Sequence, residues 1–204
     1  MATRVLGVVG FVGAAAWLAL NTVLSPEWGP PGSGNYLGYE TINRLWGPCF
    51  AAMLAGYVGF FARRPLPGRL GRGARWFVFG GLTAMIFGNV AEFWFFTDLA
   101  HGEWNARSLA WMLVLVGMLS LLIGLALAAW AGARERVWPP WVSAAFALAL
   151  PVTLALVFTG SAYMFIVLPL VSGLAGALAV RRAAARPTAR PAPPVRSPAT
   201  GRQS

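Results

Sequence analysis

Six long apolar segments constrain the fold of this chain more than any other feature of its sequence. A helix of about 20 residues, rising 1.5 Å per residue, crosses the roughly 30 Å hydrocarbon core of a bilayer. The segments that meet this length are Val5–Leu24, Ile42–Ala62, Trp76–Thr97, Leu109–Gly132, Trp141–Thr159 and Tyr163–Val180. A soluble domain of 204 residues that is 58% hydrophobic could not cover so much apolar surface. We therefore predict an all-α, polytopic integral membrane protein with six transmembrane helices in one bundle.

The arginines predict how this bundle is oriented. All sixteen basic residues are arginine, and fourteen of them precede the first segment, follow the sixth, or lie between segments two and three or four and five. Only Arg44 and Arg107 remain for the opposite side. Positive charge is retained on the cytoplasmic side during insertion, so we place both termini in the cytoplasm and the protein in the cell membrane. Six crossings return the chain to its starting side, in agreement with this charge pattern.

The sequence divides into a transmembrane domain, residues 1–180, and a basic tail, residues 181–204. The tail is rich in proline, alanine and arginine and has no apolar face, so we predict that it is disordered. Its six arginines are expected to contact anionic lipid headgroups at the cytoplasmic face. The absence of lysine together with abundant Ala, Gly, Arg and Pro suggests a GC-rich bacterial genome.

Two glycine-rich stretches separate predicted helices. Ser25–Tyr36 contains too much proline and glycine for a regular element and is predicted to be an outer loop. Gly68–Gly73 reads GRLGRG, but no strand precedes it and no Lys-Ser or Lys-Thr pair follows, as a phosphate-binding loop requires. We predict that Gly68–Gly73 is a flexible, positively charged cytoplasmic loop.

Glu92 is an acid inside an otherwise apolar segment, GNVAEFWFFTD (Gly88–Asp98). An unpaired charge at membrane depth costs at least a few kcal/mol, so a partner or protonation is expected. Arg44 enters the second segment from the outer side at about the same depth. We therefore predict an ion pair between Glu92 and Arg44.

Other polar residues are expected at the same level. Glu40 and Arg44 are four residues apart on one helix face in the favourable order, with Asn43 next to them. Asn89 lies one turn before Glu92 on its own helix face. Further members of this polar layer are predicted to be Asn21, Thr22, Thr159, Ser161 and Tyr163.

The inner half of the predicted bundle is much less polar. Its few polar side chains are Tyr57, Thr83, Ser120 and Ser172. A single hydroxyl can bond the carbonyl of the preceding helical turn, so these side chains need no shared network. A transport path needs polar groups or water along its whole length. The asymmetry therefore argues against a continuous conduit.

Scarce residues exclude several kinds of chemistry. Cys49 is the only cysteine and His101 the only histidine, so an intrachain disulfide, a Cys-x-x-Cys pair and bis-histidine haem ligation are impossible within one chain. Without lysine there is no Schiff base. Asp98, His101 and Glu103 share one outer loop, but loop spacing alone is weak support for a metal site. We predict no metal, no cofactor and no enzymatic activity.

Two interpretations of the Glu92 cluster remain open. It is either an ion pair that fixes helix register or a ligand- or ion-binding pocket open to the outside. We expect a non-enzymatic sensing or accessory subunit, and the alternative is a small secondary transporter with Glu92 as its proton-coupled carboxylate. The expected partner is the lipid bilayer, while a homo-oligomer or a membrane-protein partner stays open. No nucleic acid is expected, since the charge pattern already has a topological explanation.

Glycines and tryptophans provide two further predictions. Small residues at helical spacing let helix backbones approach closely. The glycines that we expect to do so are Gly7, Gly10, Gly13, Gly56, Gly59, Gly173 and Gly176. Tryptophans near span ends are typical of the aromatic belts at membrane interfaces. The predicted belt residues are Trp28, Trp46, Trp94, Trp104, Trp111, Trp138 and Trp141.

Overall fold

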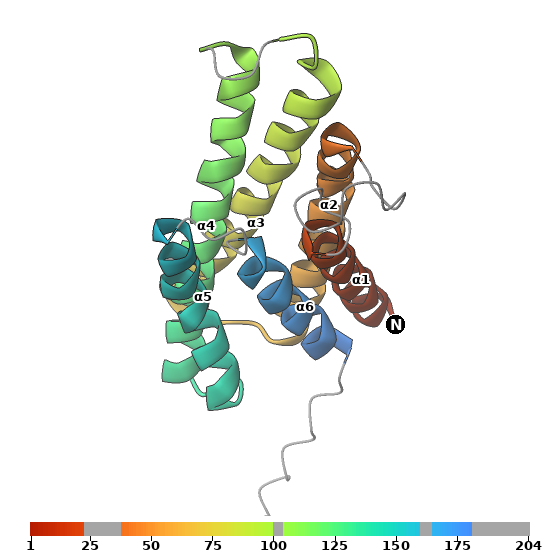
Figure 1. Ribbon diagram of the computed structural model, residues 1–204. Coiled ribbons are helices and arrows are strands. Elements are labelled where there is room, and N and C mark those ends of the chain that lie inside the picture. Colours follow the sequence, from red (N-terminus) through yellow and green to blue (C-terminus); the bar gives the residue numbers. More distant parts are fainter. Residues whose placement is uncertain (23–37, 100–103, 160–164, 181–204) are drawn as a thin grey trace, which may run out of the picture.

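The computed structural model describes residues 1–22, 38–99, 104–159 and 165–180, and all regular structure in these ranges is helical (Figure 1). The elements are α1 Ala2–Thr22, α2 Tyr39–Arg63, α3 Gly68–Val90, the π-helix η1 Ala91–Phe95, α4 Ala106–Arg134, α5 Pro140–Phe158 and α6 Val167–Val180. The predicted outer loop (25–36) and the predicted disordered tail (181–204) lie outside the described residues.

Five helices are long and apolar enough to cross a membrane: α1, α2, α3 continued by η1, α4 and α5. They correspond to the first five predicted segments. α6 is apolar but has only 14 residues, about 21 Å of helix, which is less than the bilayer core. The chain just before it, residues 160–164, lies outside the described residues. The structure thus shows five helices of spanning length and a shorter sixth.

α3 begins two turns earlier than predicted. Gly68–Gly73, which we predicted to be a flexible loop, forms its first turns instead. Gly71 packs directly on the backbone of the buried Leu66, and a side chain at this position would collide with it. The loop prediction was wrong because this packing outweighs the low helix propensity of glycine.

Glycines set the closest helix contacts. A Cβ atom on Gly10 of α1 would overlap the Cα atom of Gly56 on α2. Between α3 and α4, a Cβ on Gly81 would lie 2.6 Å from the Gly117 carbonyl oxygen, and the reverse distance is also 2.6 Å. The predicted close approach at Gly10 and Gly56 is confirmed. The α3–α4 contact was not predicted.

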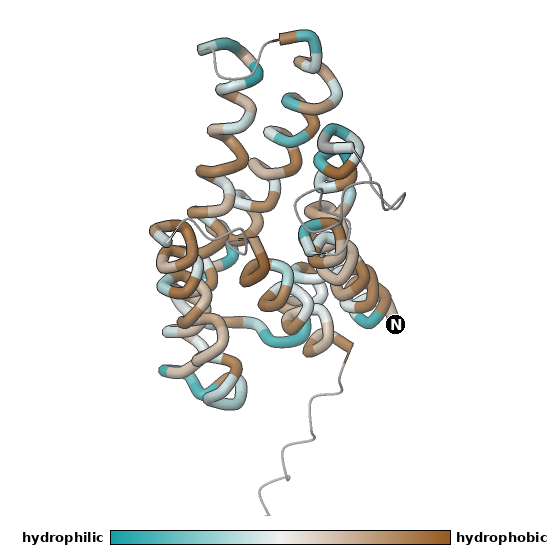
Figure 2. The backbone as a smooth tube through the Cα atoms, in the orientation of Figure 1, coloured by the Kyte–Doolittle hydropathy of each residue, from teal (hydrophilic) through white to brown (hydrophobic). Residues whose placement is uncertain are grey.

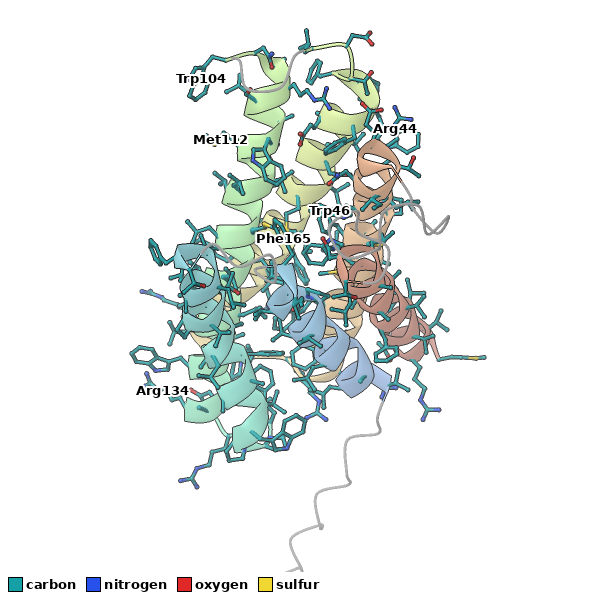
Figure 3. All side chains as sticks on the ribbon, in the orientation of Figure 1. Arg44, Trp46, Trp104, Met112, Arg134 and Phe165 are labelled. Atoms are coloured by element: carbon teal, nitrogen blue, oxygen red, sulfur yellow. The ribbon has the colours of Figure 1, made fainter. Side chains whose placement is uncertain are left out.

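An aromatic core joins α1, α2 and α5 with Phe165, which precedes α6. The Trp17 ring meets Phe50 edge to face with centroids 4.9 Å apart, and Trp46 meets Phe165 at 5.3 Å (Figure 3). Trp46 and Trp138, which we assigned to interfacial belts, are both 5% exposed and belong to this core. The sequence shows only that both tryptophans lie near helix ends. In the structure α1 covers Trp46 and α5 covers Trp138.

Apolar residues make up much of the length of the helices (Figure 2). Exposed large apolar side chains occur on every helix, and among the most exposed are Trp76, Phe87, Val116 and Phe158. Burying apolar side chains stabilises each by about 1.5–3 kcal/mol, so water is a poor solvent for this surface. The exterior suits a lipid environment.

The arginine-bearing helix ends gather at one end of the bundle, which we call the arginine-rich end. Arg63 Nε donates to Thr3 Oγ1 at 2.9 Å, and its Nη1 donates to the Val180 carbonyl at 3.5 Å. The start of α3 lies beside Arg134 at the end of α4. Arg44 and Trp104 lie toward the opposite end (Figure 3). The start of α1 and the end of α6 therefore lie on the same side of the bundle.

Candidate functional site

Polar side chains meet where α2 begins, α3 ends in η1, and α4 begins. We call Glu40, Asn43, Arg44, Asn89, Glu92 and Arg107 the polar cluster. Asn89 Nδ2 donates to the Asn43 carbonyl at 2.9 Å, which ties α3 to α2. Gly47 makes room for this approach, since a Cβ there would lie 2.9 Å from Asn89 Oδ1. The structure thus brings together helices two and three at the predicted level.

The predicted ion pair between Glu92 and Arg44 is not formed. Arg44 Nε donates instead to the Phe93 carbonyl at 2.9 Å. The last carbonyls of a helix lack an intrahelical partner, and a guanidinium satisfies one of them here. Arg44 also pairs with Glu40 at 3.8 Å, as predicted, and both side chains are about half exposed. Arg44 therefore links α2 to the end of α3 through the backbone.

Glu92 lies in the π-helical turn η1 and is 4% exposed. Phe96 N donates to the Ala91 carbonyl at 2.9 Å, a bond five residues apart that defines this wider turn. Such turns are rare in proteins, and those that occur often lie at functional sites. In the described part of the chain, no basic nitrogen lies within 4.0 Å of the Glu92 carboxylate. Among the described residues the buried cation is Arg107, at the start of α4, and α4 contacts η1.

Arg107 is a member of the polar cluster that the sequence analysis did not identify. It is 4% exposed, and its Nη1 donates to the carbonyls of Thr97 and Leu99 at 3.0 Å each. Its guanidinium carbon lies 5.8 Å from the centre of the Phe93 ring. We had placed Arg107 in a loop because the fourth apolar segment starts at Leu109, whereas α4 begins at Ala106.

A signal for Arg107 was present in the sequence. It is one of only two arginines assigned to the outer side, and it follows Asn105, a residue type that favours helix N-caps. The Asn105 side chain does accept a bond from Ser108 N at 3.2 Å. A prediction that the fourth helix starts directly after Asn105 would have placed Arg107 in its first turn, next to the end of α3.

Several buried atoms of the polar cluster have no hydrogen-bond partner among the described residues. Two are acceptors, Glu92 Oε2 and Asn89 Oδ1, and two are donors, Arg107 Nε and Nη2. Leaving such a group unsatisfied costs about 1–3 kcal/mol, and more when it is charged. The polar cluster therefore contains a buried carboxylate oxygen, a buried amide oxygen and two buried guanidinium nitrogens that no described residue bonds.

Other predicted members of the polar layer do not join the cluster. Asn21, Thr22 and Thr159 bond to carbonyls of their own helices, at 2.7, 2.8 and 2.9 Å. Ser161 and Tyr163 lie outside the described residues, as do His101 and Glu103.

Asp98, the remaining residue of the weak metal motif, is exposed, whereas Glu92 is buried. Within the described ranges, no three side chains of His, Cys, Asp or Glu gather closely enough to hold a metal ion. A metal-binding role is thus not supported by any described group of residues.

The half of the bundle nearer the arginine-rich end is apolar inside. Tyr57 Oη and Ser172 Oγ form a buried hydrogen bond of 3.1 Å, and Trp138 Nε1 donates to Ser143 Oγ. Among the described residues, the buried charged side chains are Glu92 and Arg107, and both belong to the polar cluster. Phe60 and Phe146, both fully buried, pack together with rings 5.7 Å apart.

Comparisons of the chain with protein-family models, with curated protein sequences and with solved structures find no match.

Proposed function

We propose that this chain is a non-enzymatic, multi-pass protein of the cell membrane that binds a small polar ligand at the polar cluster and acts as a sensing or accessory subunit. In this proposal α6 and the residues before it complete a sixth crossing, and both termini are cytoplasmic. The polar cluster then faces the outside, because it lies opposite the arginine-rich end. The shared position of Thr3 and Val180 supports an even number of crossings.

The observation that carries this proposal is the set of unused polar atoms on Glu92, Asn89 and Arg107. A packed structural ion pair would use most of its donors and acceptors internally. Here a carboxylate oxygen and two guanidinium nitrogens have no partner among the described residues. A small ligand with both a cationic and an anionic group would complement them, so a zwitterion is the favoured ligand class.

The transporter alternative has one observation in its favour, the buried carboxylate of Glu92. Intramembrane acids often relay protons in transporters. Against it stands the aromatic packing of Phe60, Trp138 and Phe146, which fills the half nearer the arginine-rich end. A proton entering at Glu92 meets no second buried carboxylate among the described residues. We therefore favour binding over transport.

Two measurements test the proposal. Free amino acids serve as zwitterionic probes in thermal unfolding of the purified protein. At 100 times its Kd a ligand adds about 2.7 kcal/mol of stability, so a bound probe raises Tm by several degrees. We expect at least one probe to do this for the wild type and not for Glu92→Gln or Arg107→Gln. Arg69→Gln at the arginine-rich end is the matched control and should respond like the wild type.

The second measurement follows proton flux into proteoliposomes with an entrapped pH-sensitive dye under an imposed potential. We expect the same flux as in protein-free vesicles. Flux that depends on the protein and disappears in a folded Glu92→Gln variant would favour the transporter. If no probe raises Tm, the binding proposal is wrong.

A further inference from the structure

A groove runs along one face of α3 at the arginine-rich end, far from the polar cluster. It has a volume of about 580 Å³ and is lined by Arg72, Arg75, Trp76, Phe79, Gly80 and Thr83. This volume lies within the range of ligand sites in proteins. These residues recur at helical spacing, so the two arginines lie at one end of the groove and the apolar side chains continue from them.

The two arginines are available for a ligand. Neither Arg72 nor Arg75 forms a hydrogen bond or ion pair with any described residue, in contrast to Arg44, Arg63 and Arg107. Arg72 is exposed and Arg75 is half-buried. Arg75 directly precedes the largely exposed Trp76, and Arg72 lies about one helical turn before Trp76. These two unpaired guanidiniums form a local site for an anion.

The floor of the groove is open because of Gly80. A Cβ atom built there has no other group within 4 Å. Phe79 forms one side and packs edge to face against Phe61 of α2 with centroids 5.7 Å apart. From Arg72 to Thr83 the groove spans about 16 Å along the helix axis. An extended hydrocarbon chain can lie along such an apolar groove.

The length of α3 sets the level of this groove in a bilayer. From Trp76 to Phe95 there are about 20 residues, enough for the roughly 30 Å hydrocarbon core. Arg72 and Arg75 then lie at the headgroup level and Phe79 to Thr83 beside the acyl chains. Basic pockets at this level on the cytoplasmic side bind anionic headgroups.

We propose that this groove is a binding site for one anionic phospholipid, with its phosphate held by Arg72 and Arg75 and one acyl chain lying over Gly80. The charge at one end and the apolar surface beyond it match the two parts of such a lipid. The site is separate from the polar cluster, so it does not depend on ligand binding there; it rests only on the proposed placement of the chain in a membrane.

The test compares retained lipids by native mass spectrometry. Full-length protein is purified from nanodiscs that contain equal amounts of phosphatidylglycerol and phosphatidylcholine. We expect the wild type to retain phosphatidylglycerol preferentially. A basic residue near a membrane surface contributes a factor of about five in lipid affinity, so Arg72→Gln/Arg75→Gln should lower the preference at least fivefold. The matched control Arg69→Gln/Arg134→Gln removes the same charge at the same end and should keep the preference.

A second variant tests the apolar part of the groove. Gly80→Leu adds an apolar side chain to the groove, and its Cβ meets no other group within 4 Å, so the protein should fold and retain less phosphatidylglycerol. Unchanged retention in Gly80→Leu or in the double variant Arg72→Gln/Arg75→Gln would overturn the proposal. So would an equal loss in the matched control, since it would indicate a general effect of charge. Displacement of the lipid by free glycerol phosphate would show that the site takes a phosphate and needs no acyl chain.

Discussion

Arg44 of α2 and Arg107 of α4 both bond to the backbone at the end of the third helix, where the last carbonyls lack helical partners. Each guanidinium donates to carbonyls that no further helical turn can satisfy, Phe93 for Arg44 and Thr97 and Leu99 for Arg107. They differ in burial, because Arg44 is about half exposed and Arg107 is 4% exposed. A buried charge acts through less solvent, so we expect Arg107, rather than Arg44, to compensate Glu92.

This difference predicts the outcome of a double-mutant cycle on Glu92 and Arg107. Arg107→Gln should cost more stability in the wild type than in a Glu92→Gln background, because only the wild type is left with an uncompensated buried carboxylate. We expect a coupling energy of about 1–2 kcal/mol. It is measured from unfolding of the four proteins in detergent.

The control is the same double-mutant cycle on Glu92 with Arg44→Gln in place of Arg107→Gln. Arg44 bonds a backbone carbonyl and Glu40, so its coupling to Glu92 should stay below about 0.5 kcal/mol. A larger coupling for Arg44 than for Arg107 would contradict the assignment and restore the ion pair expected from the sequence.

At the scale of elements, the α3–α4 pair depends on glycines that bring backbones into contact. Gly81 packs against the backbone of Gly117 and Leu121, and Gly88 lies equally close to Ala110. Dispersion between such closely packed backbones is a main source of helix association in lipid, where the hydrophobic effect is absent. This hairpin holds η1 and the start of α4 together, and so it brings the element that carries Glu92 to the element that carries Arg107.

Two adjacent glycines offer a matched test of this packing. In Gly81→Ala the added methyl would lie 2.6 Å from the Gly117 oxygen, and backbone cannot move aside cheaply, so we expect a loss of about 1–3 kcal/mol. Gly80→Ala meets nothing within 4 Å and gains helix propensity, so it should be neutral or stabilising by up to about 1 kcal/mol. Unfolding in detergent measures both, and equal losses would show that packing at Gly81 is not responsible.

The helices were predictable from the sequence to different degrees. Apolar length alone located α1 to α5, because a bilayer demands about 20 consecutive apolar residues. The start of α3 was missed because the burial of Gly71 against Leu66 is a tertiary contact that no local propensity reveals. The start of α4 was missed for a related reason, since hydropathy falls off at Arg107 although the helix continues.

At the scale of the whole molecule, the level of the polar cluster was predictable but its pairing was not. Sequence position along a helix fixes depth, which is how Asn43, Asn89 and Glu92 were assigned to one layer. Which side chain meets which depends on helix rotation and on atoms that the sequence does not place, such as the Phe93 carbonyl that takes Arg44. For the same reason Trp46 was assigned to an interface although α1 covers it.

The arrangement of the helix ends predicts the result of a cysteine-labelling experiment. The natural Cys49 is 7% exposed, so the wild type should resist a membrane-impermeant maleimide in intact cells and serve as the background. Trp104→Cys, at the polar-cluster end, should be labelled from outside if the arginine-rich end faces the cytoplasm, as we propose. Ala2→Cys and Arg134→Cys, both at exposed positions of the arginine-rich end, should be labelled only after permeabilisation. Labelling of Ala2→Cys and Arg134→Cys from different sides would contradict the shared position of these helix ends. Labelling of both from outside would mean that the orientation is reversed and that the polar cluster faces the cytoplasm.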